Sequence, residues 1–396
     1  MRWLAWIKRA VFLLVVIGLI SAASQAAQRW HAETAALTAE AERLRREAAS
    51  EPDPVLAAAL RQDAQRHESA IPGWGNVRWG YAALAGLMYA AGLVPPGWVL
   101  HRGLQALSVP CSRRRAVAAQ LLGHAGKYIP GKAMVVFLRV GAILPKSSSA
   151  VAASSDVGPS SAGEALHAHT TSLDPRGQAP VSTRPIGRVA SCVFFETLLM
   201  MGVGGAVAGL LLWRSPLPDW VRLIAAAMAI GSLIPLCPPL LRRLLAFIAA
   251  RRKIKPDQNP AAREETFSPD SITWSLLIQC WGLSLISWAL IGGAFALLIA
   301  SIPSFEPLPA ASELAAVATA AISLGMVLGF ASLLPGGAGV REYVTLLVLT
   351  PVIGSTHALL AVIAARLMFI IVEALMAGLS AAYLRHLHYL QPLGEG

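Results

Sequence analysis

Long apolar runs constrain this chain more than any other feature of its sequence. About six of them approach or exceed the roughly 20 residues that an α-helix needs to cross a hydrocarbon core of about 30 Å. They cover Ala10–Ala27, Trp79–Val99, Ala190–Trp213, Leu223–Leu241, Ile272–Ile302 and Leu359–Tyr383. Only 14% of the 396 residues are charged, whereas a soluble domain carries about 25%. The sequence therefore predicts an all-α polytopic membrane protein and excludes a disordered chain, a disulfide-rich secreted scaffold and an ordinary cytosolic enzyme.

Changes in composition divide the chain into four parts. Residues 1–27 begin with a short basic stretch and resemble either a cleavable signal peptide or an uncleaved anchor helix, and the length of the apolar run favours the anchor. Residues 28–76 mix charges of both signs with Ala and Leu, which predicts a solvated helical hairpin broken at Pro52–Pro54. Residues 77–384 form the transmembrane domain, with a flexible loop at 144–188, and residues 385–396 form a tail.

The distribution of Lys and Arg predicts the orientation, because these residues gather in cytoplasmic loops. Basic groups at Lys8–Arg9, 113–115, 242–255 and Arg385 place both termini, loop 144–188 and segment 242–263 in the cytoplasm. No Lys or Arg occurs between Arg263 and Arg341. Residues 303–311 are therefore expected outside, together with residues 28–76.

Two further apolar segments are interrupted by proline and glycine. Segment 116–143 is broken at Pro130–Gly131, and segment 314–353 is broken at Pro335–Gly337. The charge pattern requires each to begin and end on one side of the membrane, so we expect two re-entrant segments that enter from opposite sides. The first half of the second segment nearly reaches spanning length, so its tip should lie deep. This arrangement suggests an inverted repeat with a substrate site near mid-membrane.

The first interrupted segment brings three cations to its break. Pro130 removes a backbone donor and Gly131 permits positive φ, so the helix must end there. Lys132 and Arg139 are seven residues apart and share a helix face. Cations beside a broken helix suit a lipid phosphate. The alternative is that these side chains simply extend to the cytoplasmic headgroups. That alternative is less favoured for Arg139, which lies within an apolar run, than for the two lysines. The candidate residues are Lys127, Tyr128, Pro130, Gly131, Lys132 and Arg139.

The second interrupted segment combines a glycine-rich loop with an arginine. Its glycines free backbone N–H groups for a ligand, and a helix that starts near Val340 would favour an anion at its N-terminus. Arg341 and Glu342 are neighbours, so we expect them not to face each other and each to have another partner. The alternative is a structural turn with an adjacent salt-bridged pair. The candidate residues are Pro335, Gly336, Gly337, Gly339, Arg341 and Glu342.

Three single ions within apolar runs complete the candidate site. Glu196 lies in the middle of the chain, and Arg366 and Glu373 share one face of the last run. A buried ion is costly, so each should face a partner or a cavity. The alternative is a structural ion pair between helices.

Enzyme signatures are absent from the sequence. It contains no nucleophile elbow, phosphate-binding loop or zinc-protease motif. The four cysteines form no C-x-x-C pair and are expected to be inert packing thiols. We therefore expect no catalytic activity, no metal, no cofactor and no nucleic-acid partner.

The two interrupted motifs resemble those of a known family. Gly126–Lys132 followed by Arg139 is similar to the Y-[LI]-P-G-K…R signature of the flippase-like, lysylphosphatidylglycerol synthase transmembrane-region family, and Leu333–Glu342 is similar to its P-G-G-x-G-x-R-E signature. The resemblance covers about Trp79 to Leu384 and implies a multi-pass inner-membrane protein. In this family Arg usually follows the glutamate that corresponds to Glu196, whereas Thr197 follows it here. Relatives that make aminoacyl lipids carry a soluble transferase domain after the membrane part, and this chain is expected to lack that activity.

These observations favour a lipid flippase or lipid-binding transporter that holds an anionic, aminoacylated or polyprenyl/terpenoid lipid headgroup between the broken helices. The alternative is a non-catalytic membrane partner of a lipid-modifying enzyme or glycosyltransferase, with residues 28–76 as a docking arm. The sequence leaves open which lipid is bound and what oligomer forms.

Overall fold

The computed structural model describes residues 30–71, 75–127, 133–144, 185–213, 273–304, 307–332, 337 and 339–390, with a few isolated positions elsewhere. This part of the chain is helical and contains no strand. Five of its helices are long and apolar enough to cross a membrane, namely Trp79–Ala106, Ile186–Trp213, Trp274–Ser301, Ala311–Ala331 and Ser355–Leu387. The all-α, multi-pass class is thus confirmed. The anchor at 1–27, most of the run at 223–241, positions 145–184 of the loop and segment 242–263 lie outside the described residues, so the count of six spans stays a prediction.

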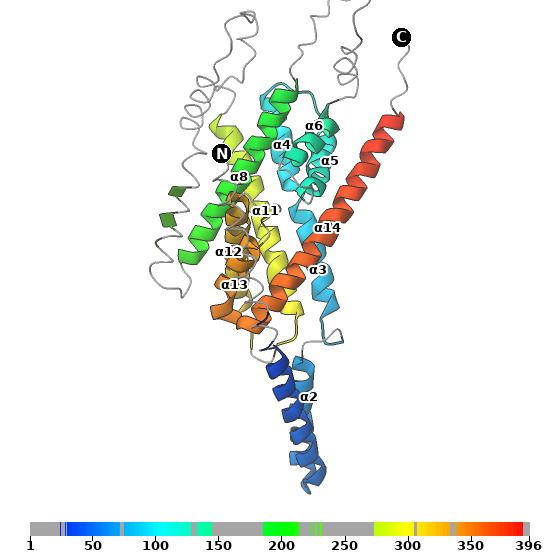
Figure 1. Cartoon of the computed structure of the whole chain (residues 1–396), viewed down its shortest axis with the longest axis vertical. Coiled ribbons are helices and arrows are strands. Elements are labelled where there is room, and N and C mark those ends of the chain that lie inside the picture. Colours follow the sequence, from blue (N-terminus) through cyan, green and yellow to red (C-terminus); the bar gives the residue numbers. More distant parts are fainter. Residues whose placement is uncertain are drawn as a thin grey trace, which may run out of the picture.

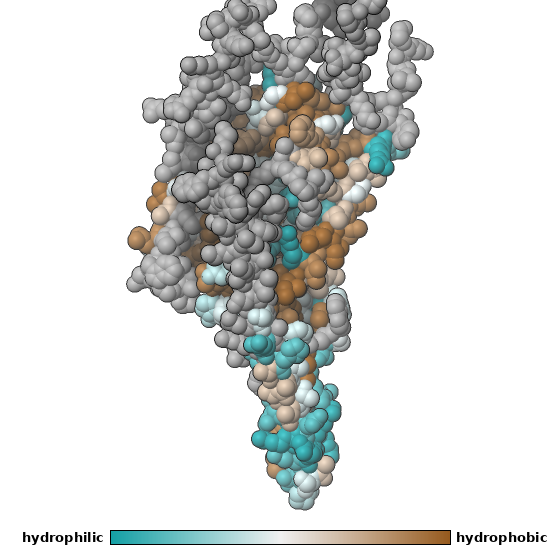
Figure 2. Space-filling view, viewed as in Figure 1, coloured by the Kyte–Doolittle hydropathy of each residue, from teal (hydrophilic) through white to brown (hydrophobic). Residues whose placement is uncertain are grey.

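Residues 30–70 form a helical hairpin, which we call the arm. A helix at 30–50 turns into α2 (Pro54–Ala70), where the Asp53 side chain caps the backbone N–H of Val55 and Pro54 occupies the first turn. The arm thus turns at the predicted Pro52–Pro54 break. Its two helices approach through buried alanines and are joined by the Arg45–Glu68 ion pair at 2.8 Å. The arm projects from one end of the helical bundle and is hydrophilic over most of its surface (Figures 1 and 2).

The first membrane-length unit is made of two consecutive helices, α3 (Trp79–Gly92) and α4 (Pro95–Ala106). Pro95 has no backbone N–H, which accounts for the interruption between them. The unit extends beyond the predicted boundary at Val99. It packs against α11 (Trp274–Ser301), where the Ser287 hydroxyl donates to the Gly92 carbonyl at 2.6 Å. Gly92 faces Ile291 so closely that a Cβ would lie 3.0 Å from its Cγ1, so glycine allows the helices to approach.

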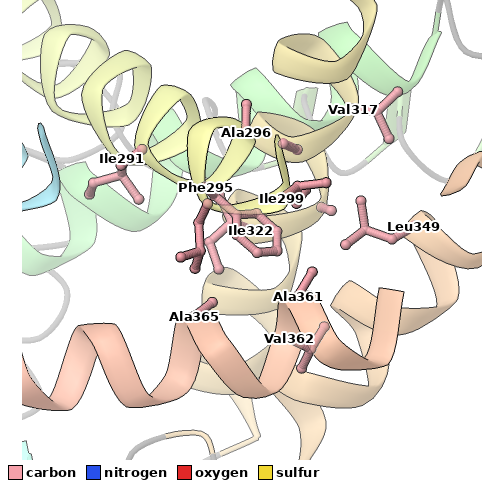
Figure 3. Packing of buried hydrophobic residues seen from close by; sticks show 14 of the residues in the cluster. Ile291, Phe295, Ala296, Ile299, Val317, Ile322, Leu349, Ala361, Val362 and Ala365 are labelled. Carbon is pink, nitrogen blue, oxygen red and sulfur yellow. The ribbon is translucent and has the colours of Figure 1, made fainter. Parts of the chain in front are cut away.

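The core lies where α11 meets α12 (Ala311–Ala331), α13 (Val340–Ile353) and α14 (Ser355–Leu390). Figure 3 shows this packing. The residues labelled there are Ile291, Phe295, Ala296, Ile299, Val317, Ile322, Leu349, Ala361, Val362 and Ala365. α8 (Pro185–Trp213) joins the bundle through Trp288 of α11, whose indole N–H donates to the Met200 carbonyl at 3.0 Å.

Three short helices occupy one end of the bundle: α5 (Arg113–Gly123), the 3-10 helix η1 (His124–Lys127) and α6 (Ala133–Ile143). α14 also ends there, and it continues to Leu390, past the expected boundary at residue 384. Figure 1 shows the start of α5, the end of α6 and the end of α14 at this end of the bundle, opposite the arm. Described segments expected in the cytoplasm thus lie at one end, and those expected outside lie at the other.

Candidate functional site: a charged cluster where two hairpins meet

Both interrupted segments fold back on themselves within the protein. At the base of the first, the Arg115 Nε donates to the Ala142 carbonyl at 2.8 Å, which joins the start of α5 to the end of α6. In the second, the Thr345 hydroxyl of α13 approaches the Ala321 carbonyl of α12 at 3.4 Å. We call α5–η1–α6 the first hairpin and α12–α13 the second hairpin. They enter the bundle from opposite ends (Figure 1).

The inner ends of both hairpins contact α14. Lys127 of the first hairpin lies 3.1 Å from Glu373, and Glu342 of the second lies 3.4 Å from Arg366. Arg366 and Glu373 are seven residues apart, which is about 10.5 Å along a helix. Since Glu373 lies near the middle of α14, the two hairpins meet well inside the bundle.

Glu373 is the residue of α14 that the polar side chains of the first hairpin contact. One carboxylate oxygen accepts a hydrogen bond from the Tyr89 hydroxyl at 2.7 Å and one from the Lys127 ammonium at 3.1 Å. The Nδ1 of His124 lies 3.5 Å from the same oxygen, too far for a good hydrogen bond, and both ring nitrogens are buried without one. Glu373 is only 3% exposed, so these contacts replace the water that a surface carboxylate would have.

Glu196 and Arg139 form a second, closed pair. Their side chains meet at 2.8 Å and are 4% and 5% exposed, respectively. The Gln120 amide donates to the other carboxylate oxygen at 3.0 Å, and the Thr197 hydroxyl lies 3.3 Å from the oxygen that Arg139 contacts. Arg139 also lies against Gly123, where a Cβ would overlap its guanidinium. The packing therefore gives Arg139 a protein carboxylate as its partner.

Glu342 organises the start of the second hairpin's return helix. It accepts a hydrogen bond from the Gly339 backbone N–H at 2.8 Å and so caps α13, which begins at Val340 as expected. Its other oxygen lies 3.4 Å from both Arg341 and Arg366. The expectation that Arg341 and Glu342 would not face each other is therefore wrong. Both lie in the first helical turn, where Glu342 bends back to the cap and the long Arg341 side chain reaches it.

An aromatic pair connects the two hairpin ends. The rings of Tyr89 and Phe369 stack with centroids 4.1 Å apart and are almost fully buried. The Arg341 guanidinium lies 5.5 Å from the centre of the Phe369 ring, a distance suited to a cation–π contact. Because Tyr89 also donates to Glu373, Phe369 and Tyr89 join the Arg341 group to the Glu373 group.

In the described part of this cluster, four cations face three carboxylates. The cations are Lys127, Arg139, Arg341 and Arg366, and the carboxylates are Glu196, Glu342 and Glu373. With His124 neutral, the net charge is +1. A cavity of about 10 Å³ borders Arg341, Arg366 and Phe369, which is room for about one water molecule. The cluster is thus nearly closed and has an excess of positive charge.

All of the candidate residues that the structure describes come together here. These are Lys127, Arg139, Glu196, Gly337, Gly339, Arg341, Glu342, Arg366 and Glu373. Gly337 and Gly339 have positive φ, with values of 66° and 87°. Tyr128, Pro130, Gly131, Lys132, Pro335 and Gly336 lie outside the described residues.

Sequence reasoning missed four polar or aromatic members of the cluster: Tyr89, Gln120, His124 and Phe369. A signal was available for two of them. Gln120, His124 and Lys127 are spaced by four and three residues, which places them on one helix face. A polar stripe of this kind on an otherwise apolar segment indicates contact with other polar groups. Nothing in the local sequence distinguishes Tyr89 or Phe369 from other aromatic residues in apolar runs.

Comparison of the chain with protein-family models and with curated proteins finds no match. Among the described residues, no group of three or more His, Cys, Asp or Glu side chains is placed to hold a metal ion. The assignment of the cluster therefore depends on its own geometry.

Proposed function

We propose that this protein binds an anionic lipid headgroup where its two hairpins meet and moves that lipid between the leaflets of the inner membrane. The observation that supports this most directly is the meeting of two interrupted hairpins, from opposite ends of the bundle, at a cluster with more cations than carboxylates. Irregular backbone deep in a membrane protein is tolerated where it is buried or lines a polar cavity. A phosphodiester carries one negative charge, which matches the excess of +1 in the described cluster.

Arg341 is the residue best suited to bind the phosphate. It lies in the first turn of α13, where backbone N–H groups and the helix dipole favour an anion. Its side chain is 13% exposed, and its described contacts are one carboxylate at 3.4 Å and the face of Phe369. A planar guanidinium can bind two phosphate oxygens at once. Arg139, in contrast, already donates to Glu196 at 2.8 Å.

The proposed transport requires the hairpins to separate. The cavity beside Arg341 admits about one water molecule, so a headgroup enters only if contacts between α14 and the hairpins open. Lys127–Glu373 and Arg366–Glu342 are the pairs to be exchanged for contacts with the phosphate. The cation of each pair is partly exposed, 39% for Lys127 and 25% for Arg366, so an entering phosphate can reach it. Glu373 is buried, so separating it from Lys127 has an electrostatic cost that the new contacts with the phosphate must offset.

The resemblance of both motifs to the flippase-like family supports the same proposal. We assign the end of the bundle that carries Arg113–Arg115 and Arg385 to the cytoplasm, with both termini there and the arm, whose arginines are mixed with carboxylates, outside. No catalytic step and no cofactor are part of the proposal. The lipid class is anionic, aminoacylated or polyprenyl/terpenoid.

A lipid-movement assay with Arg341 variants tests this function. Purified protein is reconstituted into liposomes that contain fluorescent phosphatidylglycerol, and movement is read from the fraction of label that dithionite can reduce. We expect Arg341→Ala to slow movement at least tenfold without loss of folded protein, because it removes the phosphate ligand. Arg341→Lys should restore only part of the rate, since lysine lacks the planar fork.

Arg114→Ala is the matched control, because Arg114 is exposed and lies outside the cluster. It should move lipid at the rate of the unaltered protein. Full activity of folded Arg341→Ala protein would exclude Arg341 from the site.

The arm supports a second candidate function, that of a docking partner for a lipid-modifying enzyme or glycosyltransferase. It projects beyond the bundle, and near its turn Val55 and Leu56 are 76% and 48% exposed. Apolar side chains in such a position suit contact with another protein. Replacing residues 30–70 by a short flexible linker separates the two functions. Lipid movement at an unchanged rate would favour the flippase, and its loss in a folded variant would favour a function through the arm.

A further inference from the structure

A second cavity lies at the end of the bundle where α4, the start of α5 and α11 meet. Its volume is about 610 Å³, it is open to the surface, and it shares no residue with the charged cluster. Its lining includes Trp98, His101, Arg102, Arg113, Leu283 and Ile286. This volume falls within the range of small-molecule sites, roughly 300–1,000 Å³.

One wall of this cavity is basic and aromatic. Trp98, Arg102 and Gln105 follow one another at spacings of four and three residues along the exposed face of α4. Arg113 of α5 places its guanidinium 5.7 Å from the centre of the Trp98 ring, and Arg102 contacts the Gln105 side chain at 3.4 Å. No carboxylate in the described chain pairs with either arginine. Two guanidiniums without acidic partners among the described residues thus face one cavity.

Two further features distinguish this wall from an ordinary exposed basic surface. The Nδ1 atom of His101 is buried at the wall and has no hydrogen-bond partner among the described residues. Trp98 is 39% exposed at the cavity, and the Arg113 guanidinium lies over its ring. A cation held over an aromatic ring is preorganised and loses less freedom when it binds an anion.

The opposite wall is apolar and belongs to a membrane-length helix. Leu283 and Ile286 of α11 line the cavity, and the neighbouring Ile278 and Leu285 are 66% and 49% exposed. α11 is long and apolar enough to cross a membrane, so these side chains form a surface suited to acyl chains. The cavity therefore has cations on one side and hydrocarbon on the other.

We propose that this cavity is a binding site for an anionic membrane phospholipid, with the phosphodiester between Arg102 and Arg113 and the acyl chains along α11. The apolar wall favours a lipid over a free phosphate, which would use only the basic wall. Tryptophan beside the headgroup level is the usual position of this residue in membrane proteins. Anionic lipids also concentrate in the cytoplasmic leaflet, the side to which this end of the bundle is assigned. The site does not depend on transport through the charged cluster.

The fluorine NMR signal of a labelled Trp98 reports on this cavity directly. The full chain is produced with 5-fluorotryptophan, and the Trp98 signal among those of the 11 tryptophans is assigned by its loss in Trp98→Phe. Detergent-solubilised protein is then titrated with dihexanoyl phosphatidylglycerol, dihexanoyl phosphatidylcholine or inorganic phosphate. We expect phosphatidylglycerol to shift the Trp98 signal saturably, and the other two probes to bind at least tenfold more weakly.

Arginine variants test the contacts. Arg102→Ala/Arg113→Ala should weaken phosphatidylglycerol binding at least tenfold, about 1.4 kcal/mol. Arg114→Ala, next to Arg113 but outside the cavity lining, should change it less than twofold. An unchanged signal for the buried Trp288 shows that each variant is folded. Equal weakening in Arg114→Ala, or no weakening in the double variant, would overturn the site, and tight binding of inorganic phosphate would overturn its assignment to a lipid.

Arg341→Ala separates this inference from the proposed function. It should leave the Trp98 titration unchanged while it slows lipid movement. Full lipid movement in Arg341→Ala with a normal Trp98 titration would remove the function proposed for the charged cluster and leave the surface site in place.

Discussion

Arg139 illustrates how burial changes the interpretation of a single residue. The sequence places it among candidate phosphate ligands, but its side chain is 5% exposed and its guanidinium donates to Glu196 at 2.8 Å. Removing one partner of such a pair leaves an uncompensated charge inside the protein. The geometry therefore favours a structural role for Arg139 and leaves the phosphate to Arg341, which is more exposed.

Substitutions of this pair test that distinction. Arg139→Ala should destabilise the fold by roughly 3–5 kcal/mol, because Glu196 then remains buried and charged. Arg139→Met/Glu196→Met should recover most of the folded protein, since it removes both charges and keeps the volume. Thermal unfolding and size-exclusion chromatography in detergent measure the effect, with Arg114→Ala as the exposed control. If Arg139→Ala is fully stable and loses only lipid movement, Arg139 binds the headgroup after all.

At the scale of elements, the backbone at the inner end of the second hairpin packs directly against α12, at Gly337 and Gly329. Gly337 has φ of 66°, and a Cβ built on it would lie 3.0 Å from the Cα of Gly329 in α12. Backbone atoms cannot move aside as a flexible side chain can. The loop that begins α13 therefore requires glycine both for its conformation and for its distance from α12.

Gly337→Ala should destabilise the protein by at least roughly 1–2 kcal/mol, the cost of the left-handed conformation before the contact with Gly329 is counted. Binding of the proposed headgroup near Arg341 should weaken with it, because the start of α13 must shift. Gly378→Ala is the matched control in α14, where an added Cβ would have no atom within 4 Å and alanine favours the helix. Unfolding temperature and lipid movement are measured for both. Equal stability of the two variants would show that the Gly337–Gly329 contact is not required.

The elements themselves were largely predictable, whereas their partners were not. Apolar length alone located α11 within about two residues, and the proline and glycine positions located the starts of α2 and α13, because these features act locally. The pairing of Glu196 with Arg139, or of Lys127 with Glu373, depends on which helices are neighbours and on how each helix is rotated about its axis. Short-range patterns in a single sequence do not reveal either. The Arg341–Glu342 error has a related cause, since helix-interior spacing rules do not hold in a capped first turn.

At the scale of the whole molecule, the arrangement of the two ends agrees with the charge pattern. The arginines at the start of α5, the base of the first hairpin and the end of α14 lie at one end, and the arm lies at the other (Figure 1). The Arg78 backbone N–H also donates to the Ser301 carbonyl at 2.9 Å, which joins the start of α3 to the end of α11 at the arm end. The proposed topology, in which each hairpin begins and ends on one side of the membrane, assigns a side to each of these segments.

Cysteine labelling tests this topology. In a background in which Cys111, Cys192, Cys237 and Cys280 are replaced, single cysteines are introduced at exposed positions of both ends. Ser50→Cys in the arm and Ser312→Cys at the start of α12 should react with a membrane-impermeant maleimide in intact cells. Ser112→Cys before α5 and Gly187→Cys at the start of α8 should react only after the membrane is opened, because both flank the first hairpin on the cytoplasmic side. Opposite labelling of Ser112→Cys and Gly187→Cys would mean that the chain between them crosses the membrane an odd number of times, and the first hairpin would then not be re-entrant.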